Sequence, residues 1–431
     1  LVFGGGPVLT ANPEPFSALF DVILLGDGEP LLHDFLDTYA RVRDVSRPQQ
    51  LKALAQVPGV YIPTLYEVAY LADDGPIKSI LPVDPDIPPT VKKLTYRGNV
   101  LSASTVVTEK AAWENIFMVE VVRSCPEMCR FCLASYLTLP FRAASIEASL
   151  IPAIEKGLSV TRRLGLLGAS ITQHPEFEDL LDYVNRPEYD DVRVSMSSVR
   201  TNTVNAKLAE TLVKHDSKSI TIAIESGSQR VRNIVNKKLE TDEITVAAQA
   251  AKAGGLKALK LYGMAGVPGE SQDDLAETAA LMIELKKKVP GLRLTLGCST
   301  FVPKGHTPFQ WYGVNKQAEK RLKFLQKQLR SRGIDFRPES YSWSVIQALI
   351  SRGDRRLADL LELTRGFGDT LGSYRRAFKA LKGTLPPLDF YVYEEWPTTQ
   401  VLPWEHLEGP LPKTTLVKHL EEARQHMQVN A

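Results

Sequence analysis

The feature that most restricts the fold of this chain is a regular alternation of apolar and amphipathic segments between about residues 113 and 311. The apolar segments have the length of strands, and each is followed by a stretch with helical periodicity. We predict strands at 117–122, 163–167, 192–196, 219–224, 258–262 and 292–297. This order is typical of a parallel sheet with outer helices, and the sequence therefore predicts an α/β fold, a partial (β/α)6 barrel.

The helices between these strands are indicated by the spacing of their apolar residues. We expect them near residues 148–158, 177–184, 204–215, 242–255 and 271–288. Ser271, followed by Asp273 and Asp274, is a typical start for the last of these helices. In barrels of this kind the chemistry lies on the loops at the carboxyl ends of the strands.

The regions on either side of the barrel have different patterns. LVFGGGP and DVILLGDGE each join an apolar strand to a glycine turn, as in an α/β unit, and we expect the chain to begin inside a domain. Prolines interrupt the next stretch, and after Trp311 we expect helices near 318–332, 355–367 and 414–427 but no further strands. The predicted division is 1–57 (α/β remnant), 58–110 (linker), 111–311 (barrel) and 312–431 (helical region).

Composition restricts where the protein acts. The 52 basic and 50 acidic residues nearly balance, so nucleic acid binding is not indicated. The sequence has no apolar run long enough for a membrane span and no readable signal peptide, so we expect a cytoplasmic protein without a membrane partner. Four cysteines in 431 residues are too few for a disulfide framework and favour metal or redox chemistry.

Three of the four cysteines lie in SCPEMCRFC, directly after the first barrel strand. Thiolates select zinc, copper(I) or iron–sulfur clusters, and a structural zinc site needs a fourth Cys or His ligand. The nearest candidates, His174 and Cys298, lie on other predicted loops. A [4Fe–4S] cluster held by three cysteines leaves one iron open for another ligand. A non-catalytic zinc or iron–sulfur protein, in which the cysteines only hold a loop together, stays an alternative.

The spacing C-x3-C-x-Phe-C, after the first strand of a partial barrel, resembles the radical S-adenosylmethionine (SAM) superfamily. The resemblance implies that Cys125, Cys129 and Cys132 hold a [4Fe–4S] cluster whose open iron chelates SAM. One electron from the reduced cluster then cleaves SAM to a 5′-deoxyadenosyl radical, which takes a hydrogen atom from the substrate. The resemblance also implies an electron donor such as a reductase, a flavodoxin or a ferredoxin.

The same resemblance points to SAM-binding positions at the strand ends: Phe131, Gly168, Ser195, Glu225, Gly266 and Gly269. At Gly168 the chain reads GAS where many members have GGE, so the family's acidic residue is absent there. Glu225 lies in ESGS, a close match, although its carboxylate could simply be paired with Arg230 or Arg232. The segment GMAGVPGE contains Gly266 and Gly269, and Glu270 could equally be placed there by the dipole of the next helix.

Two further segments resemble radical SAM proteins that carry a cobalamin-binding domain. FVPKGHTPFQW follows the sixth strand, and its His306 is a weak candidate for a substrate contact or base. Cys298 is a weak candidate for a reactive group and more simply a buried strand residue. At the N-terminus, Gly4, Gly5 and Gly6 match the last glycines of a flavodoxin-like cobalamin domain, although the D-x-H-x-x-G motif of that domain is not in this chain.

These observations together predict a radical SAM enzyme that uses a [4Fe–4S] cluster and SAM. The resemblance to the cobalamin-dependent group suggests a transferase that moves a methyl group to an unknown substrate, with cobalamin bound in the full-length protein. The alternative within the superfamily is a methylthiotransferase acting on tRNA or a ribosomal protein. Those relatives have a second cysteine trio and a small β-barrel, neither of which is visible in this sequence.

Overall fold

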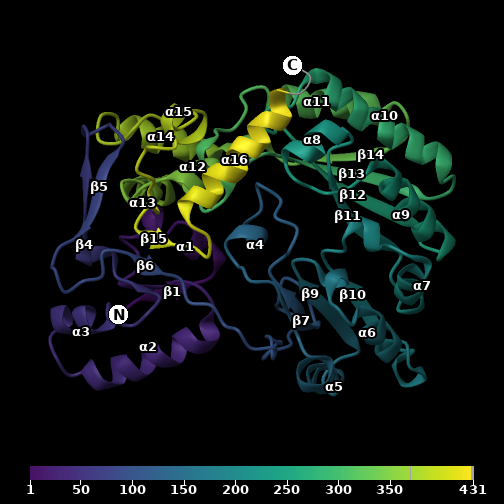
Figure 1. Ribbon diagram of the computed structural model, residues 1–431, viewed down its shortest axis with the longest axis horizontal. Helices are drawn as coiled ribbons and strands as arrows, with labels where there is room; N and C mark the ends of the chain where they lie inside the picture. The colour runs from purple at the N-terminus through teal and green to yellow at the C-terminus, as the bar shows by residue number, and fades with distance from the viewer. Residues whose placement is uncertain (369, 429–431) are drawn as a thin grey trace.

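The computed structural model of the protein describes residues 1–368 and 370–428. The predicted partial barrel is confirmed as a curved arrangement of parallel strands (Figure 1). Its six main strands are β7 (Phe117–Arg123), β9 (Arg163–Gly168), β10 (Arg193–Met196), β11 (Ser219–Glu225), β12 (Ala258–Ala265) and β13 (Arg293–Thr300). Two sheets share these strands, and a single bridge between Val199 and Ile222 joins them. The strands therefore form two sheets joined at this bridge and not one continuous sheet.

Each half of the barrel has an additional edge strand. β8 (Arg142–Ala143) pairs antiparallel with β7, and β14 (Asp335–Pro338) pairs parallel with β13. The prediction that strands stop after Trp311 is therefore wrong. β14 has four residues, ends in proline and buries only Phe336, so it has no periodic pattern by which the sequence could reveal it.

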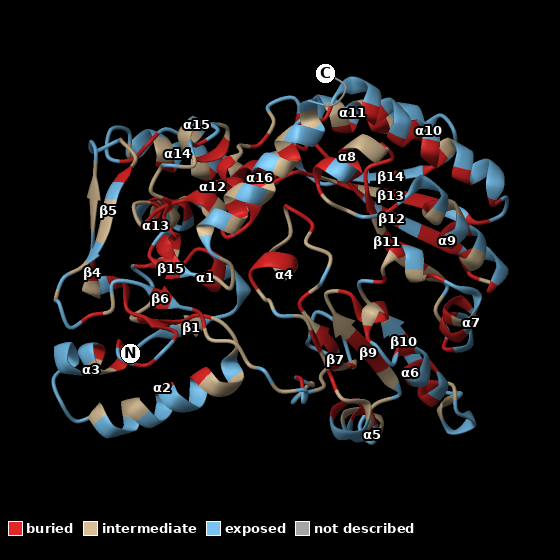
Figure 2. Cartoon of the chain, viewed as in Figure 1, coloured by how far each residue is buried: buried red, intermediate tan, exposed pale blue. Residues whose placement is uncertain are grey.

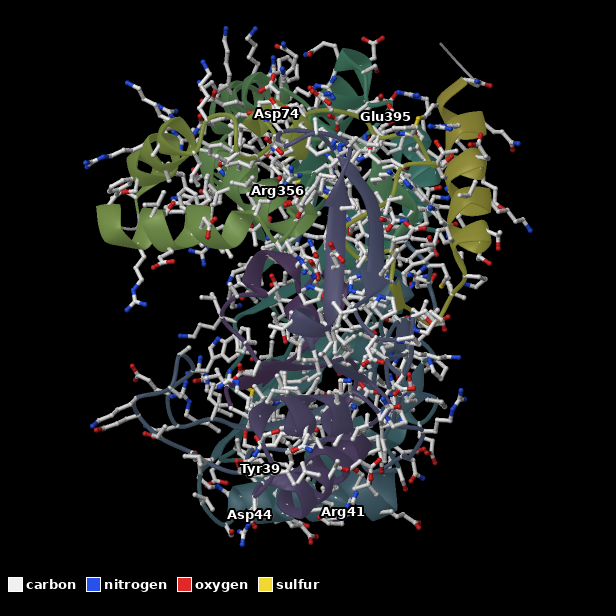
Figure 3. All side chains as sticks on the ribbon, turned by 90° about the vertical axis from the view of Figure 1, so that its left-hand side faces the viewer. Tyr39, Arg41, Asp44, Asp74, Arg356 and Glu395 are labelled. Carbon is white, nitrogen blue, oxygen red and sulfur yellow. The ribbon has the colours of Figure 1, made fainter. Side chains whose placement is uncertain are left out.

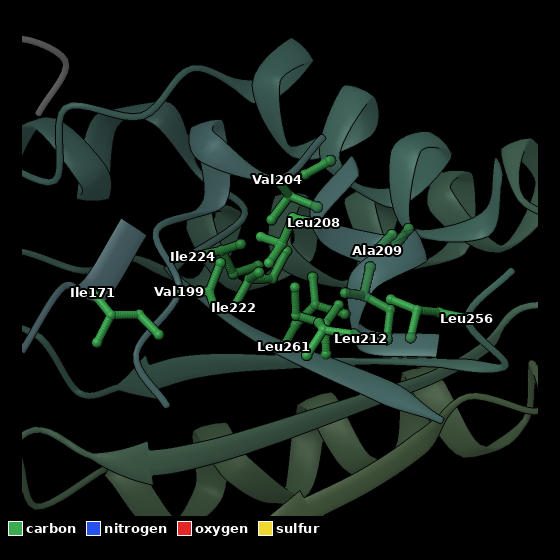
Figure 4. Close-up of a cluster of buried hydrophobic side chains, with 14 of the residues drawn as sticks. Ile171, Val199, Val204, Leu208, Ala209, Leu212, Ile222, Ile224, Leu256 and Leu261 are labelled. Carbon is green, nitrogen blue, oxygen red and sulfur yellow. The ribbon is translucent and has the colours of Figure 1, made fainter. Parts of the chain in front are cut away.

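The helices between the strands cover the outer face of the barrel, as predicted. They are α5 (Ile151–Leu158), α6 (Phe177–Val184), α7 (Ala206–Lys214), α9 (Thr241–Ala253) and α10 (Gln272–Lys288). Alternate residues of β11, Ile220, Ile222 and Ile224, are buried in the core beneath Leu208 and Leu212 of α7 (Figure 4). Each such side chain contributes about 1.5 to 3 kcal/mol on burial. Because the helices use this face, the opposite face of the strands remains available for ligands.

The N-terminal unit is a small sheet in the order β1-β2-β3, formed by β1 (Phe3–Gly5), β2 (Val22–Leu24) and β3 (Val60–Tyr61). α1 (Pro7–Ala11), α2 (Gly28–Val42) and α3 (Arg47–Leu54) connect its strands. β3 shows that this sheet continues past residue 57 into the segment expected to be a linker. The domain boundaries stay a proposal.

The segment after β3 is tied to the C-terminal region. β4 (Tyr66–Tyr70) and β5 (Ile77–Pro82) form a hairpin, and β6 (Val91–Lys92) pairs in parallel with β15 (Leu407–Glu408). Figure 3 shows Asp74 of the hairpin and Arg356 at one end of the molecule, and Tyr39, Arg41 and Asp44 at the other. Arg356 donates hydrogen bonds to the carbonyls of Asp73 and Gly75 at 2.8 and 2.9 Å.

The C-terminal region is mainly helical, as predicted. Its elements are α11 (Ala318–Arg330), α12 (Tyr341–Arg352), α13 (Leu357–Phe367), α14 (Leu371–Ala380), α15 (Leu388–Val392) and α16 (Lys413–Gln428). α11 packs on α10 of the barrel, and α16 extends from this region to α8 (Gln229–Ile234) (Figure 1). The C-terminal helices therefore contact both the N-terminal unit and the barrel.

A buried ion pair joins the two ends of the chain. Glu14, which is fully buried, accepts hydrogen bonds from the Tyr61 hydroxyl and from Arg355, whose Nε lies 2.8 Å from the carboxylate. Arg355 also donates to the carbonyl of Tyr66 at 2.8 Å. One guanidinium group thus holds the N-terminal unit and the hairpin against the C-terminal helices.

We predict that Arg355→Met lowers the free energy of unfolding by about 3 kcal/mol, because it leaves the Glu14 carboxylate buried without a cation. Urea titration measures this change. Arg337→Met is the matched control, since Arg337 is 68% exposed and pairs only with its neighbour Asp335. Its expected effect is within about 0.5 kcal/mol. Equal effects of the two substitutions would contradict this role for Arg355.

Candidate functional site

The three closely spaced cysteines lie on a loop that leaves β7 and ends in α4 (Leu133–Tyr136). Ser124 and Met128 in this loop have φ angles of 71° and 59°, which are strained for residues other than glycine. Cys125, Cys129 and Cys132 line one cavity of about 240 Å³. The strained backbone therefore bends the loop so that all three cysteines reach the same space.

The rest of this cavity, here called the cysteine cavity, is formed by the carboxyl ends of neighbouring strands. Ala169 and Ser170 follow β9, Ser198 and Arg200 follow β10, and β11 and β12 contribute further lining residues. The lining residues from these two strands are Thr221, Ile222, Ala223, Glu225 and Tyr262. The cavity thus has the position at which barrels of this type bind substrates.

The cysteine loop is fixed to α8 and the turn after it. The Arg130 backbone N–H donates to the carbonyl of Val235 at 3.0 Å, and its guanidinium donates to the carbonyls of Asn233 and Ile234, both at 2.9 Å. Asn236 donates to the carbonyl of Met128 at 2.8 Å. Within α4, Ser135 and Tyr136 are buried, and Leu133 and Ala134 are half-buried (Figure 2). These contacts hold the loop in place without using the thiols.

The cysteine thiols are in a desolvated environment next to a cation. Burial raises the pKa of Cys129 to about 12, and the nearby Lys237 opposes this shift. Burial also raises the pKa of Cys132, whereas hydrogen bonds from the backbone N–H groups of Ser135 and Ala134 act to lower it. The Cys129 and Cys132 thiols are therefore neutral near pH 7 when no metal is bound, and metal binding would release their protons.

The three thiols at the cysteine cavity are suitable ligands for an iron–sulfur cluster. The Ser135 hydroxyl, which lies against the cavity, is buried and has no hydrogen-bond partner among the described residues. Across the described residues, no three His, Cys, Asp or Glu side chains converge on a position for a single metal ion. In a [4Fe–4S] cluster each cysteine binds a different iron, so the thiols need only surround a common space. The cavity provides that arrangement.

Glu225 lies at the end of β11 with a φ angle of 62° and is buried at the cysteine cavity. Its carboxylate pairs with Lys237 at 2.8 Å, so the proposed pairing with Arg230 or Arg232 is wrong. Arg230 instead pairs with Asp274, and Arg232 donates to the carbonyls of Ser226 and Leu239. Burial alone would lower the pKa of Lys237, but Glu225 and Cys129 raise it above its usual value.

The other predicted SAM positions lie at different distances from this cavity. Phe131 lines it, whereas Gly168 lines a neighbouring cavity that shares Ala169 with it. Ser195 is exposed within β10 and is not a lining residue, while Ser198 lines the cavity instead. The role of each in SAM binding stays a prediction.

Gly266 and Gly269 lie in the turn after β12, away from the residues that line the cysteine cavity. Both have a φ angle of 79°, and a Cβ atom on Gly269 would lie 2.6 Å from Met427 of α16. The Gly266 N–H donates to Glu270 at 2.7 Å, and Glu270 also pairs with Arg321 at 2.7 Å. The turn is therefore packed against the C-terminal helices, and its contact with SAM stays a prediction.

The burial of this turn can be tested by measuring stability as a function of pH, because it shifts the pKa of Glu270. Burial raises this pKa to about 7, although the Gly266 N–H and Arg321 act to lower it. Between pH 4.5 and 7 the folded protein therefore keeps a proton at Glu270 that the unfolded chain has lost. As a result, the free energy of unfolding falls as the pH rises through this range, by up to about 3 kcal/mol. We predict that Glu270→Gln removes this part of the pH dependence, as measured by urea titration from pH 5 to 8. A variant with the wild-type slope would contradict this assignment.

The two weak catalytic candidates do not line the cysteine cavity. Cys298 is buried in the core between the barrel and its helices, where burial raises the pKa of its thiol. His306 lies in a separate cavity beside Gln310 and Trp404, and burial lowers its pKa to about 4. Its Nε2 has no hydrogen-bond partner among the described residues. Neither residue is placed for chemistry next to the three cysteines.

The sequence did not identify four charged or aromatic residues of the cysteine cavity: Glu127, Arg200, Lys237 and Tyr262. Arg200 pairs with Glu127 at 3.1 Å and links the end of β10 to the cysteine loop. Tyr262 is 56% exposed although it lies within β12, and it lines the cysteine cavity. The polar Lys260, two positions earlier and therefore on the same strand face, is a sequence signal that this face is not packed against the helices.

The predicted cobalamin glycines lie at the end of β1. Gly4 and Gly5 belong to the strand, and Gly6, with a φ angle of 97°, precedes α1. Their role stays a prediction. Among the described helices, none combines the length and apolar character needed to cross a membrane.

Comparison with known proteins agrees with this architecture. Residues 119–282 match a model of the radical SAM superfamily, and residues 1–63 match a model described as the N-terminal part of radical SAM proteins. An uncharacterised protein of Methanocaldococcus jannaschii is 28% identical over 363 residues, which are 84% of this chain and 73% of that protein. An uncharacterised methyltransferase of Pyrococcus horikoshii is 23% identical over 64% of this chain and 56% of its own length.

Among solved structures, the radical SAM methyltransferase TsrM from Kitasatospora setae, with cobalamin and a [4Fe–4S] cluster bound, has a TM-score of 0.52. The likeness covers 72% of this chain and 58% of TsrM at 12% identity, and so concerns the fold. The chain spans less than two thirds of the lengths of TsrM and of the Pyrococcus protein. The chain thus carries a radical SAM domain over residues 119–282, which includes the cysteine loop.

Proposed function

We propose that this protein is a radical SAM enzyme whose cysteine cavity holds a [4Fe–4S] cluster through Cys125, Cys129 and Cys132. The observation that carries the proposal is that these three residues line one cavity, while the fourth cysteine, Cys298, is buried in the barrel core. The chain therefore offers three thiols and leaves one iron for another ligand. The superfamily match supports SAM as that ligand.

When bound, a reduced [4Fe–4S] cluster supplies the electron that cleaves the SAM sulfonium bond. The chain's own residues have the task of holding and orienting both partners. The Lys237 ammonium lies close to Cys129 and offsets the negative charge of the thiolates. Lys237 donates to one oxygen of the Glu225 carboxylate, and the other oxygen has no hydrogen-bond partner among the described residues and is available for a polar group of SAM. Phe131 supplies an apolar wall, and the buried α4 limits the access of water.

We further propose that the protein uses cobalamin and transfers a methyl group. The fold likeness to TsrM, whose structure holds cobalamin, and the named methyltransferase of Pyrococcus horikoshii support this reading. The N-terminal unit presents apolar side chains beside its glycines, since Phe3 is 47% exposed and Val8 is 62% exposed. We propose that this surface contributes to cobalamin binding.

Anaerobic reconstitution with iron and sulfide tests the proposal. The expected result is an iron–sulfur absorption spectrum and, with dithionite and SAM, formation of 5′-deoxyadenosine. A protein that binds zinc, takes up no iron and forms no 5′-deoxyadenosine would favour the structural zinc alternative. The cobalamin proposal is tested separately, by adding hydroxocobalamin to the reconstituted protein and following a deuterated methyl group from SAM.

A further inference from the structure

Two arginines bracket the cysteine loop, and one carboxylate from the N-terminal unit contacts both. Arg123 is the last residue of β7, two positions before Cys125, and Arg142 begins β8, just after the loop. The Asp27 carboxylate pairs with Arg123 at 3.3 Å and forms a second ion pair with Arg142. All three side chains are largely buried, with exposed fractions of 14%, 6% and 11% for Arg123, Arg142 and Asp27. The two ends of the loop therefore share one anchor.

The Arg142 guanidinium holds the far end of the loop by hydrogen bonds to backbone carbonyls. Its guanidinium donates to the carbonyls of Thr138 at 2.6 Å and Pro140 at 3.0 Å, and to the carbonyl of Tyr96 at 2.6 Å. Two of these contacts, to Thr138 and Pro140, thus fix the chain direction directly after α4, and the third joins it to Tyr96. A guanidinium group in this position needs a buried anion, because its charge is largely removed from water.

Arg123 at the near end has two further carboxylate partners. It pairs with Glu29, in the first turn of α2, at 2.7 Å and with Glu120 of β7 at 2.6 Å. Asp27 and Glu29 both belong to the segment GDGE, so the start of α2 supplies two of the three anions around this arginine. Figure 1 shows that this end of α2 is the one nearest to the barrel.

The position of Asp27 is itself fixed. Its backbone N–H donates to the carbonyl of Leu94 at 3.0 Å, and its carboxylate accepts from the N–H of Tyr96 at 2.9 Å. Gly26, with a φ angle of 108°, lets the strands meet here, since a Cβ atom would lie 2.0 Å from the Leu94 carbonyl oxygen. Burial would raise the pKa of Asp27, but the hydrogen bonds from Arg142 and Tyr96 and the charges of both arginines hold it below its usual value.

We infer that Asp27 is a positioning residue for the cysteine loop, through which the N-terminal unit sets the placement of the three thiols. The inference rests on the proposed function only in taking these thiols as cluster ligands. In this view the segment GDGE couples the N-terminal unit to the cysteine cavity. The coupling acts through Arg123 and Arg142, so Asp27 contacts neither the cluster nor SAM.

The test uses the apo protein, so that its result does not depend on cluster assembly. Asp27→Asn and wild type are treated with iodoacetamide in the presence of a chelator, and alkylation at each cysteine is followed by mass spectrometry. We expect Cys125 and Cys132 of the variant to react on the order of tenfold faster, because the loop opens more often once its shared anchor is lost. Cys298, in the barrel core, serves as an internal control and keeps its wild-type rate.

Asp44→Asn is the matched control variant, since Asp44 is 91% exposed and pairs only with Arg43, and it leaves all four rates unchanged. The inference is overturned if Asp27→Asn alters no rate, or if Cys298 accelerates in parallel, which would indicate general destabilisation. Should Asp27→Asn be insoluble, Glu29→Gln removes one partner of Arg123 and is expected to accelerate Cys125 alone. No acceleration in a folded Glu29→Gln variant would equally overturn the inference. Failure to assemble a cluster in the wild type would concern the proposed function and not this result.

Discussion

Cys129→Ala is expected to reduce iron content and 5′-deoxyadenosine formation by more than about 100-fold. This exceeds the effect of removing a residue that only hydrogen-bonds to a metal ligand, because Cys129 is itself a proposed ligand. Cys129 is the most deeply buried of the three cysteines of the loop, and its side chain lies beside Lys237. Two thiols are too few to hold a cluster in which three irons each take one cysteine. Iron and sulfide analysis, together with chromatography of the SAM reaction, measures the effect.

Cys298→Ala is the matched control for that substitution. Cys298 is buried between β13 and the helices, and its replacement removes one sulfur atom from the core without touching the cysteine cavity. We expect a stability loss of about 1 kcal/mol with iron content unchanged. Equal iron loss in the two variants would show that the spacing of the three cysteines has no special role.

The second large effect concerns the buried pair of Glu225 and Lys237. Each single substitution, Glu225→Gln or Lys237→Met, leaves an unpaired charge at the cavity and is expected to cost about 3 kcal/mol of stability. The double variant restores stability, since neither charge remains. If Glu225 binds SAM, affinity falls roughly tenfold in Glu225→Gln and does not recover in the double variant, as expected for loss of a charge-assisted hydrogen bond.

Urea titration and equilibrium binding of SAM to the reconstituted protein separate these two contributions. Asp389→Asn is a suitable control, because Asp389 forms an exposed ion pair with Lys316 and should change neither quantity. Recovery of SAM affinity together with stability in the double variant would show that the pair only supports the fold. Glu225 would then no longer be a SAM ligand candidate.

The barrel could be predicted from the sequence because its strands are buried beneath helices. In SITIAIE the three isoleucines all face the helical layer, and such an apolar segment between two amphipathic helices has few other interpretations. The position of the site could also be predicted, because the three closely spaced cysteines directly follow the first strand. Ser271 also caps α10 as expected, accepting a hydrogen bond from the Asp274 N–H.

The residues that depend on tertiary placement could not be predicted in the same way. Lys237 reaches Glu225 only because α8 turns the chain back toward the end of β11, and a lysine in a loop has no periodic signature. Likewise, Asp27 and Arg142 are 115 residues apart, and nothing local in either segment indicates their contact. β14 was missed because its four residues bury one side chain.

The central claim is that the three cysteines leave one iron of a cluster open to SAM. Low-temperature electron paramagnetic resonance of the reduced, reconstituted protein tests it most directly, with and without SAM that carries ¹⁵N in its amino group. We predict that SAM shifts the g values of the cluster signal and that the nitrogen shows hyperfine coupling to it. A cluster signal that SAM does not change, or a folded protein that holds zinc and no iron, would contradict the account.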